Sequence, residues 1–177
     1  MDPVLHPSTI PPASRLIIRQ GGVSDLGGIV RLCEKHAEYW DGLLPSAIRL
    51  TRFFERALKS QDEIFQFWIA ESGHGAMVGW EMLSAETADP ANRRLTAQAT
   101  TCLGRESSAL GRMLATHAIR HAVRTPLQYV FARVPTRDTL MGSVLEAVGY
   151  QEVGLIPAAA KPPARPEQLE FVYVVER

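Results

Sequence analysis

Two apolar segments separated by a four-residue turn constrain the fold of this chain more than any other feature of its sequence. They read IFQFWIAE (64–71) and AMVGWEMLS (76–84), with SGHG between them. Each segment is short and rich in aromatic and aliphatic residues, as strands are, and Gly73 and Gly75 suit the backbone of a tight turn. We therefore predict an antiparallel hairpin in the middle of the chain, against which the other elements pair or pack.

Regular segments follow one another on both sides of this hairpin. Alternating or continuous apolar runs predict strands, whereas apolar residues three and four positions apart predict helices. The strands are expected at 15–20, 64–71, 76–84, 94–103, 127–134, 150–156 and 169–176. The helices are expected at 24–37, 43–60, 109–124 and 136–148. This order predicts an α+β or mixed α/β domain in which helices cover the faces of one sheet.

Three of the predicted helices carry an apolar stripe that we expect to face the sheet. Ser24 is the predicted N-cap of the first helix, and Pro45 lies in the first turn of the second. Pro126 marks the end of the third. The stripes consist of Leu26, Ile29, Val30, Cys33 and Ala37 in the first helix, Leu50, Phe53, Phe54, Ala57 and Leu58 in the second, and Leu110, Met113, Leu114, Ala118 and Ala122 in the third.

The composition bounds the class of protein. A chain of 177 residues fits one domain, predicted at 15–177, and residues 1–14, with four prolines, are interpreted as a separate arm. Nineteen basic and nineteen acidic residues give a formal charge of zero, which argues against nucleic acid and anionic membranes as partners. The remaining partners are a small molecule or another protein. The chain has only two cysteines, no apolar run long enough to span a bilayer and no signal-peptide pattern, and we therefore predict a cytoplasmic protein.

The segment LGRESSALGRML (103–114) joins a threonine-rich strand to the third predicted helix. The first amides of a helix have no backbone partner and carry partial positive charge, so a short turn of small residues there suits an anion. Arg105 and Arg112 flank the turn and suit phosphate oxygens. The alternative is purely structural, with Ser108 as an N-cap and Gly111 present for helix packing.

With these segments in this order, the chain resembles the GNAT superfamily of N-acetyltransferases over nearly its whole length. The family motif Gln/Arg-x-x-Gly-x-Gly/Ala, whose amides bind the pyrophosphate of acetyl-CoA, falls on Glu106, Ser107, Ser108, Ala109, Leu110 and Gly111. The segments RLIIRQGGVSDLGGIVRL, FWIAESGHGAMVGWEML and SVLEAVGYQEVG also resemble family elements. The resemblance implies a central, mostly antiparallel twisted sheet of about seven strands, with helices on both faces, and acetyl-CoA as co-substrate.

The resemblance also implies where the cofactor lies. In the family the fourth strand splays away from the fifth, and the pantetheine arm lies in the gap. This places Cys102 and Leu103 beside that arm and Asp138 after the fifth strand. Together with the turn, the implied cofactor-binding residues are Cys102, Leu103, Arg105, Ser107, Ser108, Ala109, Leu110, Gly111, Arg112 and Asp138.

The family reaction needs a base for the acceptor amine and an acid for the leaving thiolate. Glu81 is the candidate base, with Glu71 as the other carboxylate near the expected cleft, although both also suit solvated strand positions. The acid is commonly a tyrosine in the last helix, where this chain has Leu145, so Tyr150 is the candidate acid, its alternative being a core aromatic. The amine is expected to belong to a small molecule or a peptide.

The acceptor site is expected at the end of the first helix, where EKHAEYWDGLLP offers a half-aromatic, half-polar wall. The residues that line it in this prediction are His36, Tyr39, Trp40 and Asp41. The same residues suit simple packing of the helix end. The loop IPAAAKPPARPEQ, with Lys161 and Arg165, is expected to be either a lid over the acceptor or disordered.

Other interpretations compete with the enzyme. The departures at Glu106, Ala109 and Leu145 favour a non-catalytic acyl-CoA-binding or regulatory module, and a scaffold that dimerises through its sheet edge and proline-rich arm without cofactor is a third possibility. The resemblance suggests a homodimer. His117 and His121 have metal-ligand spacing but no third ligand near them in the sequence, so no metal is expected.

Overall fold

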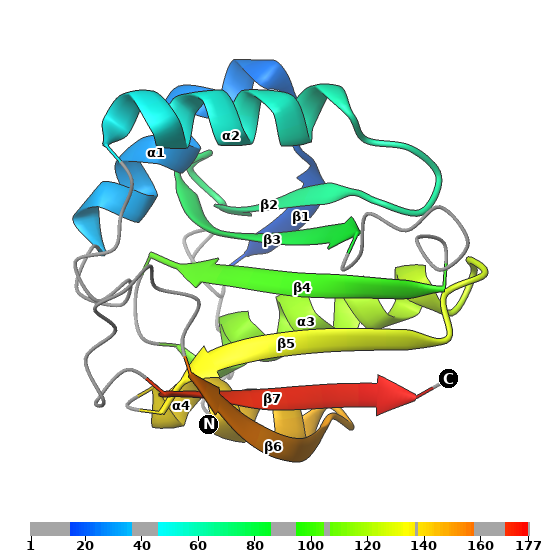
Figure 1. Cartoon of the computed structure of the whole chain (residues 1–177). Coiled ribbons are helices and arrows are strands. Elements are labelled where there is room, and N and C mark those ends of the chain that lie inside the picture. Colours follow the sequence, from blue (N-terminus) through cyan, green and yellow to red (C-terminus); the bar gives the residue numbers. More distant parts are fainter. Residues whose placement is uncertain are drawn as a thin grey trace, which may run out of the picture.

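The computed structural model describes residues 15–36, 46–85, 95–104, 107–136, 138–157 and 169–176. The predicted arm at 1–14 lies outside these residues. The described chain forms a seven-stranded sheet in the order β1-β2-β3-β4-β5-β7-β6. All neighbouring strands are antiparallel except β4 and β5, which are parallel. The predicted α+β class, the strand number and the mostly antiparallel sheet are therefore confirmed (Figure 1).

The first half of the chain forms one edge of the sheet and the helices above it. In chain order these elements are β1 (Leu16–Gln20), a single 3-10 turn (Val23–Asp25), α1 (Leu26–Lys35), α2 (Ala47–Lys59), β2 (Phe67–Ser72) and β3 (Met77–Ala85). The predicted hairpin is β2 and β3, paired from Phe67↔Met82 to Glu71↔Met77. Gly75 has the positive φ of 76° that its tight turn requires, whereas Gly73 is not in the left-handed region.

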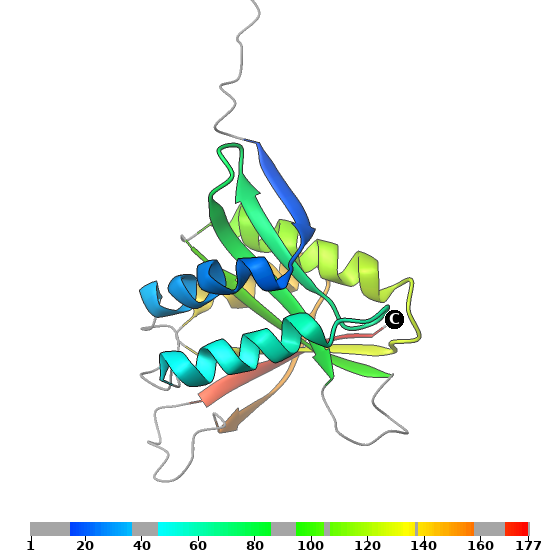
Figure 2. The ribbon, with the colours of Figure 1, turned by 90° about the horizontal axis from the view of Figure 1, so that it is seen from above.

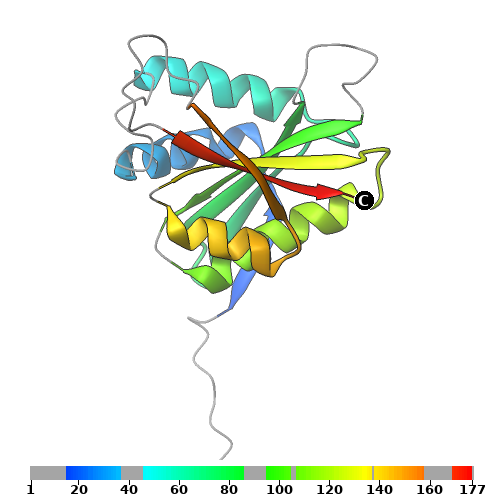
Figure 3. The same ribbon diagram turned by 60° about the horizontal axis from the view of Figure 1, so that its bottom comes forward.

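The second half forms the centre and the other edge of the sheet. Its elements are β4 (Thr96–Leu103), α3 (Ser108–Ala122), β5 (Tyr129–Pro135), α4 (Thr139–Ala147), β6 (Gln151–Pro157) and β7 (Leu169–Glu176). The parallel pairing of β4 and β5 follows from the α3 crossover between them, since a helix of this length returns the chain to the same end of the sheet. Figure 2 shows α1 and α2 on one side of the sheet and α3 on the other, and Figure 3 shows α4 beside α3.

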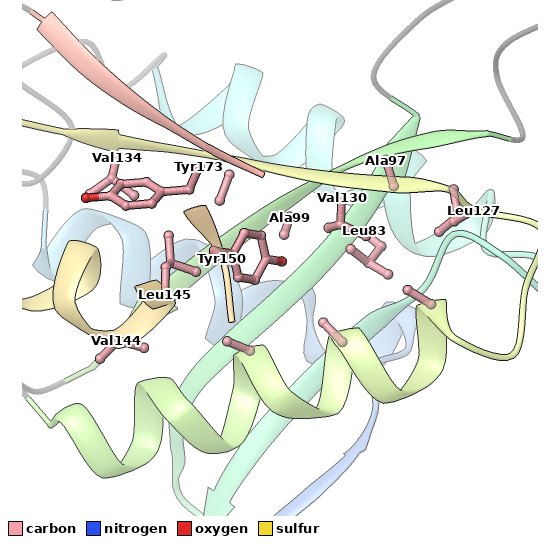
Figure 4. Packing of buried hydrophobic residues seen from close by; sticks show 14 of the residues in the cluster. Leu83, Ala97, Ala99, Leu127, Val130, Val134, Val144, Leu145, Tyr150 and Tyr173 are labelled. Atoms are coloured by element: carbon pink, nitrogen blue, oxygen red, sulfur yellow. The ribbon is translucent and has the colours of Figure 1, made fainter. Parts of the chain in front are cut away.

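Two large clusters of buried side chains lie on the two faces of the sheet. The cluster under α1 and α2 is built around Phe54, Phe67 and Trp80, whose ring centroids are 5.2 to 6.0 Å apart. The cluster under α3 and α4 combines small residues of α3 with aliphatic and aromatic residues of the strands, among them Tyr150 and Tyr173 (Figure 4). Each face of the sheet is thus covered by a pair of helices.

The structure corrects two residues of the predicted stripes. Phe53 is 54% exposed, because Leu50, Phe54 and Leu58, spaced four apart, form the row of α2 that faces the sheet. Met113 is also exposed, since it lies one position away from Leu114, which points into the core. The remaining stripe residues of α2 and α3 are buried or half-buried.

The structure also corrects two helix starts. Ser24 does not cap α1, because it lies inside the 3-10 turn that precedes the helix, and Asp25 is the residue before Leu26. Ser108 is the first residue of α3 and Ser107 is its N-cap. Of the helices described here, none is both long and apolar enough to cross a lipid bilayer.

Candidate functional site

Strands β4 and β5 run side by side only over their first halves. Their pairing extends from Thr96↔Tyr129 to Ala99↔Ala132, although β4 continues to Leu103 and β5 to Pro135. In Figure 1 the two arrows separate towards their heads. On its other edge, β4 stays paired with β3 as far as Leu103. The last residues of β4 therefore have one edge that no described strand covers, in the middle of the sheet.

The first turn of α3 follows this open edge in the chain, five residues after the end of β4. The Ser107 side-chain oxygen accepts a hydrogen bond from the Leu110 amide at 3.2 Å, and the Ser107 carbonyl accepts one from the Gly111 amide at 3.0 Å. The amides of Ser108 and Ala109 precede the first intrahelical bond, so the helix itself offers them no carbonyl. Ser108 is half-buried and Ala109 is exposed. Two donors with the positive end of a helix behind them suit an anion.

Leu110 and Gly111 contribute to packing rather than to an open surface. Leu110 is fully buried in a small cluster with Ala70 and Leu114. A Cβ at Gly111 would lie 3.1 and 3.2 Å from the two methyl carbons of Val144 on α4, so the glycine permits close packing of the two helices. Among the predicted cofactor residues of this turn, Ser108 and Ala109 offer amides and the exposed Arg112 offers a cation.

The predicted cofactor residues on β4 and before α4 have structural contacts of their own. The Cys102 side chain is buried in the cluster under α1 and α2, and a hydrogen bond with the Cys33 thiol raises its pKa, as does burial. The Leu103 side chain is half-buried near Gly111. The Asp138 carboxylate caps α4 by accepting from the Met141 amide at 3.0 Å. On β4, therefore, the backbone of Cys102 and Leu103 is what the open edge presents.

Glu81, the predicted base, is fully buried on β3. It lies opposite Thr101 of β4, and the Thr101 hydroxyl donates to Glu81 Oε2 at 2.7 Å. The other carboxyl oxygen, Oε1, has no hydrogen-bond partner among the described residues. Loss of hydration raises the Glu81 pKa to about 7, and the Thr101 bond offsets only part of that shift. Glu81 is thus a carboxyl group that titrates near neutral pH and is connected to β4 through one hydroxyl.

Tyr150, the predicted acid, lies directly before β6 and is buried among the apolar side chains between the sheet and α3 (Figure 4). Its hydroxyl has no hydrogen-bond partner among the described residues. Burial raises its pKa, and the charge of Glu81 raises it further, which places the two groups within electrostatic reach. Leu145 is fully buried in the same cluster, so this position of α4 carries an apolar side chain.

The second candidate base, Glu71, has a structural partner. Its Oε1 accepts from Arg19 Nη2 at 2.6 Å, and the same guanidinium contacts Asp25 Oδ1 at 2.7 Å. This network ties β1 to β2 and to the turn before α1, and the Arg19 hydrogen bond lowers the pKa of Asp25. Glu71 therefore joins elements at the edge of the sheet, several strands from β5.

His117 and His121 also pack against a strand. Both rings contact the Trp68 ring edge-on, with centroids 5.2 and 5.1 Å away. His121 Nε2 lies 3.0 Å from the Ile64 carbonyl oxygen, which only accepts, so this ring nitrogen is the donor. Within the described ranges, no three His, Cys, Asp or Glu side chains are grouped as metal ligands.

The predicted acceptor wall is described only in part. His36 is half-buried directly after α1. Tyr39, Trp40 and Asp41 lie outside the described residues, as do Arg105 of the turn and the Lys161 and Arg165 loop. The acceptor side of the site therefore rests on the sequence prediction.

Thr101 is the residue of this site that the sequence did not single out. A threonine in a strand is ordinary, and its importance depends on the β3–β4 register that sets it opposite Glu81. The sequence carried one weak signal, a charged residue inside the apolar run MVGWEML, because a buried carboxylate needs a hydrogen-bonding neighbour. It did not say which strand supplies that neighbour.

The completed geometry can be compared with known proteins. No protein-family model and no curated protein matches this sequence. Solved structures do match it. A ribosomal-protein-alanine N-acetyltransferase from Brucella melitensis aligns with a TM-score of 0.74 at 15% identity, covering 91% of this chain and 99% of its own. A GNAT superfamily phosphinothricin acetyltransferase from Sinorhizobium meliloti, solved in complex with acetyl-CoA, aligns with a TM-score of 0.72 at 15% identity, covering 91% and 88%.

A GNAT-family acetyltransferase from Streptococcus pneumoniae also aligns, with a TM-score of 0.72 at 16% identity, covering 92% of this chain and 100% of its own. Alignments that cover both chains almost completely compare whole domains rather than a shared motif. The chain has the GNAT fold, as the sequence predicted. At these identities the likeness concerns the fold, and the activity is argued below from the site.

Proposed function

We propose that this protein is an acetyl-CoA-dependent N-acetyltransferase that acetylates a primary amine of a small molecule or a peptide. The observation that carries the proposal is the open edge of β4, followed in the chain by the first turn of α3 with its two amides that have no intrahelical partner. The backbone of the open edge thereby offers amides and carbonyls to an extended arm, and the first turn of α3 offers two helix amides to an anion. Acetyl-CoA has both parts, and its thioester supplies the carbonyl that an amine attacks.

The residues present fit this co-substrate. The amides of Ser108 and Ala109, with Arg112 nearby, would hold the phosphates, and the backbone of Cys102 and Leu103 would pair with the pantetheine arm. A backbone amide on this open edge would also stabilise negative charge that develops on the carbonyl oxygen. The complex of the Sinorhizobium meliloti acetyltransferase with acetyl-CoA supports the choice of donor, because that protein has the same fold.

Glu81 is closed to solvent, so a proton from the acceptor amine has to reach it through another group. The half-buried Thr101 hydroxyl suits this relay, because it lies beyond the last residue that β4 pairs with β5 and already donates to Glu81. When Thr101 Oγ1 takes the proton of the amine, its own proton passes to Glu81 Oε2. A carboxyl pKa near 7 leaves about half of the molecules ready to accept that proton at neutral pH.

The cofactor site can be tested by removing a single amide. Ser108 is the first residue of α3, where proline is tolerated, and Ser107 before it is extended, as a residue before proline prefers. We expect Ser108→Pro to weaken the binding of acetyl-CoA about tenfold, since one charge-assisted hydrogen bond is lost. Isothermal titration measures the effect. The control is Ser108→Ala, which keeps the amide and should bind as the wild type does.

Equal affinities of the Pro and Ala variants would place the phosphates elsewhere. Turnover is followed separately, as release of CoA thiol with a panel of amines. Binding near one equivalent per chain together with turnover on any amine supports the enzyme. No binding of acetyl-CoA or CoA to the wild type would contradict the proposal outright and favour a scaffold without cofactor.

The alternative function is a non-catalytic acyl-CoA-binding module. Two observations favour it, the apolar Leu145 where the family commonly has its acid, and the complete burial of Glu81. Under this alternative Ser108→Pro still weakens binding, but no amine gives thiol release. A homodimer and a cytoplasmic location stay predictions in both cases.

A further inference from the structure

The outer face of α2 has an unusual composition for a solvated helix surface. Successive residues of a helix are rotated by about 100°, so a set of side chains confined to an arc of about 140° forms one face. The row Leu50, Phe54 and Leu58 faces the sheet. On the opposite side lie Ile48, Arg49, Arg52, Phe53, Arg56 and Lys59. All six are exposed, and we call this set the outer face of α2.

The outer face is strongly basic within a chain whose formal charge is zero. Its only acidic neighbour on the helix is Glu55, which already pairs with Lys59 at 2.5 Å. None of the three arginines forms an ion pair with a residue that the structure describes. Guanidinium groups are weakly hydrated and match carboxylates in two-pronged geometry, so a row of them without partners favours an anionic ligand.

The same face exposes two large apolar side chains. Ile48 is 65% exposed and Phe53 is 54% exposed, and they lie at the two sides of the basic row. Exposed aromatic and arginine residues together are enriched in protein interfaces. Phosphates of a nucleic acid would satisfy the arginines but leave Phe53 and Ile48 uncovered, whereas a polypeptide with acidic and apolar residues satisfies both.

The outer face also lies near the proposed site. In Figures 1 and 2 the N-terminal end of α2 is on the side of the molecule where β4 and β5 separate. The face extends from Ile48 to Lys59, which corresponds to about 17 Å along the helix. About five residues of an extended peptide cover that length. The face is therefore too long for a small amine and suits a segment of polypeptide that continues towards the site.

From these observations we infer that the outer face of α2 docks an acidic polypeptide segment containing apolar residues, and that this polypeptide is the acceptor. The second half of the inference rests on the proposed function. The neutral charge of the whole chain, which argued against nucleic acid and anionic membranes as partners, hides this local concentration of cations. Docking away from the reacting amine would set the KM for the acceptor and leave kcat to the site.

The probe is a fluorescein-labelled peptide of about a dozen residues, with a free N-terminal alanine followed by alternating glutamate and leucine. Two comparison peptides replace every glutamate by lysine or every leucine by serine. We expect the first peptide to bind the wild type most tightly in an anisotropy titration, the serine peptide more weakly and the lysine peptide not at all. Added salt should weaken the binding, because the attraction involves exposed charges.

Matched variants locate the binding on α2. Arg52→Glu with Arg56→Glu should lower affinity at least about tenfold. The control, Arg120→Glu with Arg124→Glu, reverses the same charges at the same spacing on and just after α3, on the other side of the sheet, and should bind as the wild type does. Phe53→Ser should cost about threefold, whereas Met113→Ser, an exposed apolar residue of α3, should cost nothing.

The outcomes separate this inference from the proposed function. Equal binding of the glutamate and lysine peptides, or equal effects of the α2 and α3 charge reversals, would overturn the docking face. Tighter binding of phosphatidylserine vesicles or of a DNA duplex than of the glutamate peptide, lost in the same α2 variants, would overturn the polypeptide as occupant. Peptide binding with intact acetyl-CoA binding but no acetylation of the peptide would keep the docking face and overturn its role for the acceptor. Failure of acetyl-CoA binding alone would count against the proposed function only.

Discussion

Trp80 and Glu81 are consecutive residues of β3, both are fully buried, and they point to opposite faces of the same sheet. Trp80 lies under α1 and α2, where its ring is 5.3 Å from the Phe54 ring and 5.2 Å from the Phe67 ring. Glu81 lies under α3, hydrogen-bonded to Thr101 and within electrostatic reach of Tyr150. One face is filled by aromatic rings, and the other holds a carboxyl group in its middle.

This difference separates stability from chemistry. Aromatic rings stabilise the fold by removing apolar surface from water and by edge-to-face contact. A buried carboxyl with one hydrogen bond is costly when charged. A leucine at position 81 would have kept the second face apolar, as Leu83 does two residues later. The carboxyl lies instead beside the open part of β4, where we propose that acetyl-CoA binds.

The first prediction breaks the aromatic face. Phe54→Ala removes the ring that contacts both Phe67 and Trp80 and leaves a cavity in a fully buried site. We expect a loss of about 3–5 kcal/mol in the free energy of unfolding, measured by urea denaturation. Binding of acetyl-CoA should persist at temperatures where the variant is folded.

The neighbouring residue provides the control. Phe53→Ala changes the same residue type on the same helix, but its ring is more than half exposed. Its loss should stay below about 1 kcal/mol. Equal losses for the two variants would mean that the aromatic face does not dominate stability.

The sequence predicted the fold well because the fold depends on periodicity. The hairpin at 64–84 and the element order determined the number of strands, and β7 was predicted at the residues where it is observed. The prediction of buried residues was wrong where a shift of one position along a helix decides whether a side chain is buried. Phe53 and Met113 lie at the margins of their stripes, and a rotation of 100° separates a buried from an exposed side chain.

The site was less predictable because it depends on register and on close approach. The identity of Gly111 suggested either an anion turn or helix packing, and only the distance to Val144 on α4 shows that it packs. Glu81 was a candidate from its position, but its complete burial and its bond to Thr101 follow from the pairing of β3 with β4. The basic outer face of α2 was hidden by the neutral total charge.

The second prediction removes the charge from the polar face. The Glu81 pKa of about 7 lies above the unfolded value of 4.5, so the folded state keeps a proton that the unfolded state loses between these pH values. Stability contributed by the protonated carboxyl is therefore full below pH 4.5 and lost as the pH rises towards 7, by about 3 kcal/mol. Glu81→Gln should abolish this slope and be more stable than the wild type at pH 8.

The comparison with the wild type isolates Glu81 from the other groups with shifted pKa values that pack on this face, among them Tyr150, Tyr173 and His117. His117 contributes in the opposite direction, because burial lowers its pKa and its stabilisation is lost as the pH falls. Urea denaturation across pH is the measurement, with the exposed Glu34→Gln as control. If Glu81 is also the base, Glu81→Gln and Thr101→Val should each lower kcat. Thr101→Ser keeps the hydroxyl that donates to Glu81, so its kcat should match that of the wild type. A pH slope unchanged by Glu81→Gln would contradict the raised pKa.

The smallest expected effect concerns the Tyr150 hydroxyl. It is buried without a hydrogen-bond partner among the described residues, so folding removes its hydrogen bonds with water and no described group replaces them. Tyr150→Phe should therefore raise the free energy of unfolding by about 1 kcal/mol and leave the rate of thiol release unchanged.

The same variant decides between the two interpretations of Tyr150, a core aromatic or the acid that protonates the leaving thiolate. A rate reduced about tenfold, with acetyl-CoA affinity intact, would mean that the hydroxyl reaches the leaving thiolate during turnover and that the polar face supplies both acid and base. An unchanged rate leaves Glu81 as the titratable group of that face which, among the described residues, is connected through Thr101 to the open edge of β4.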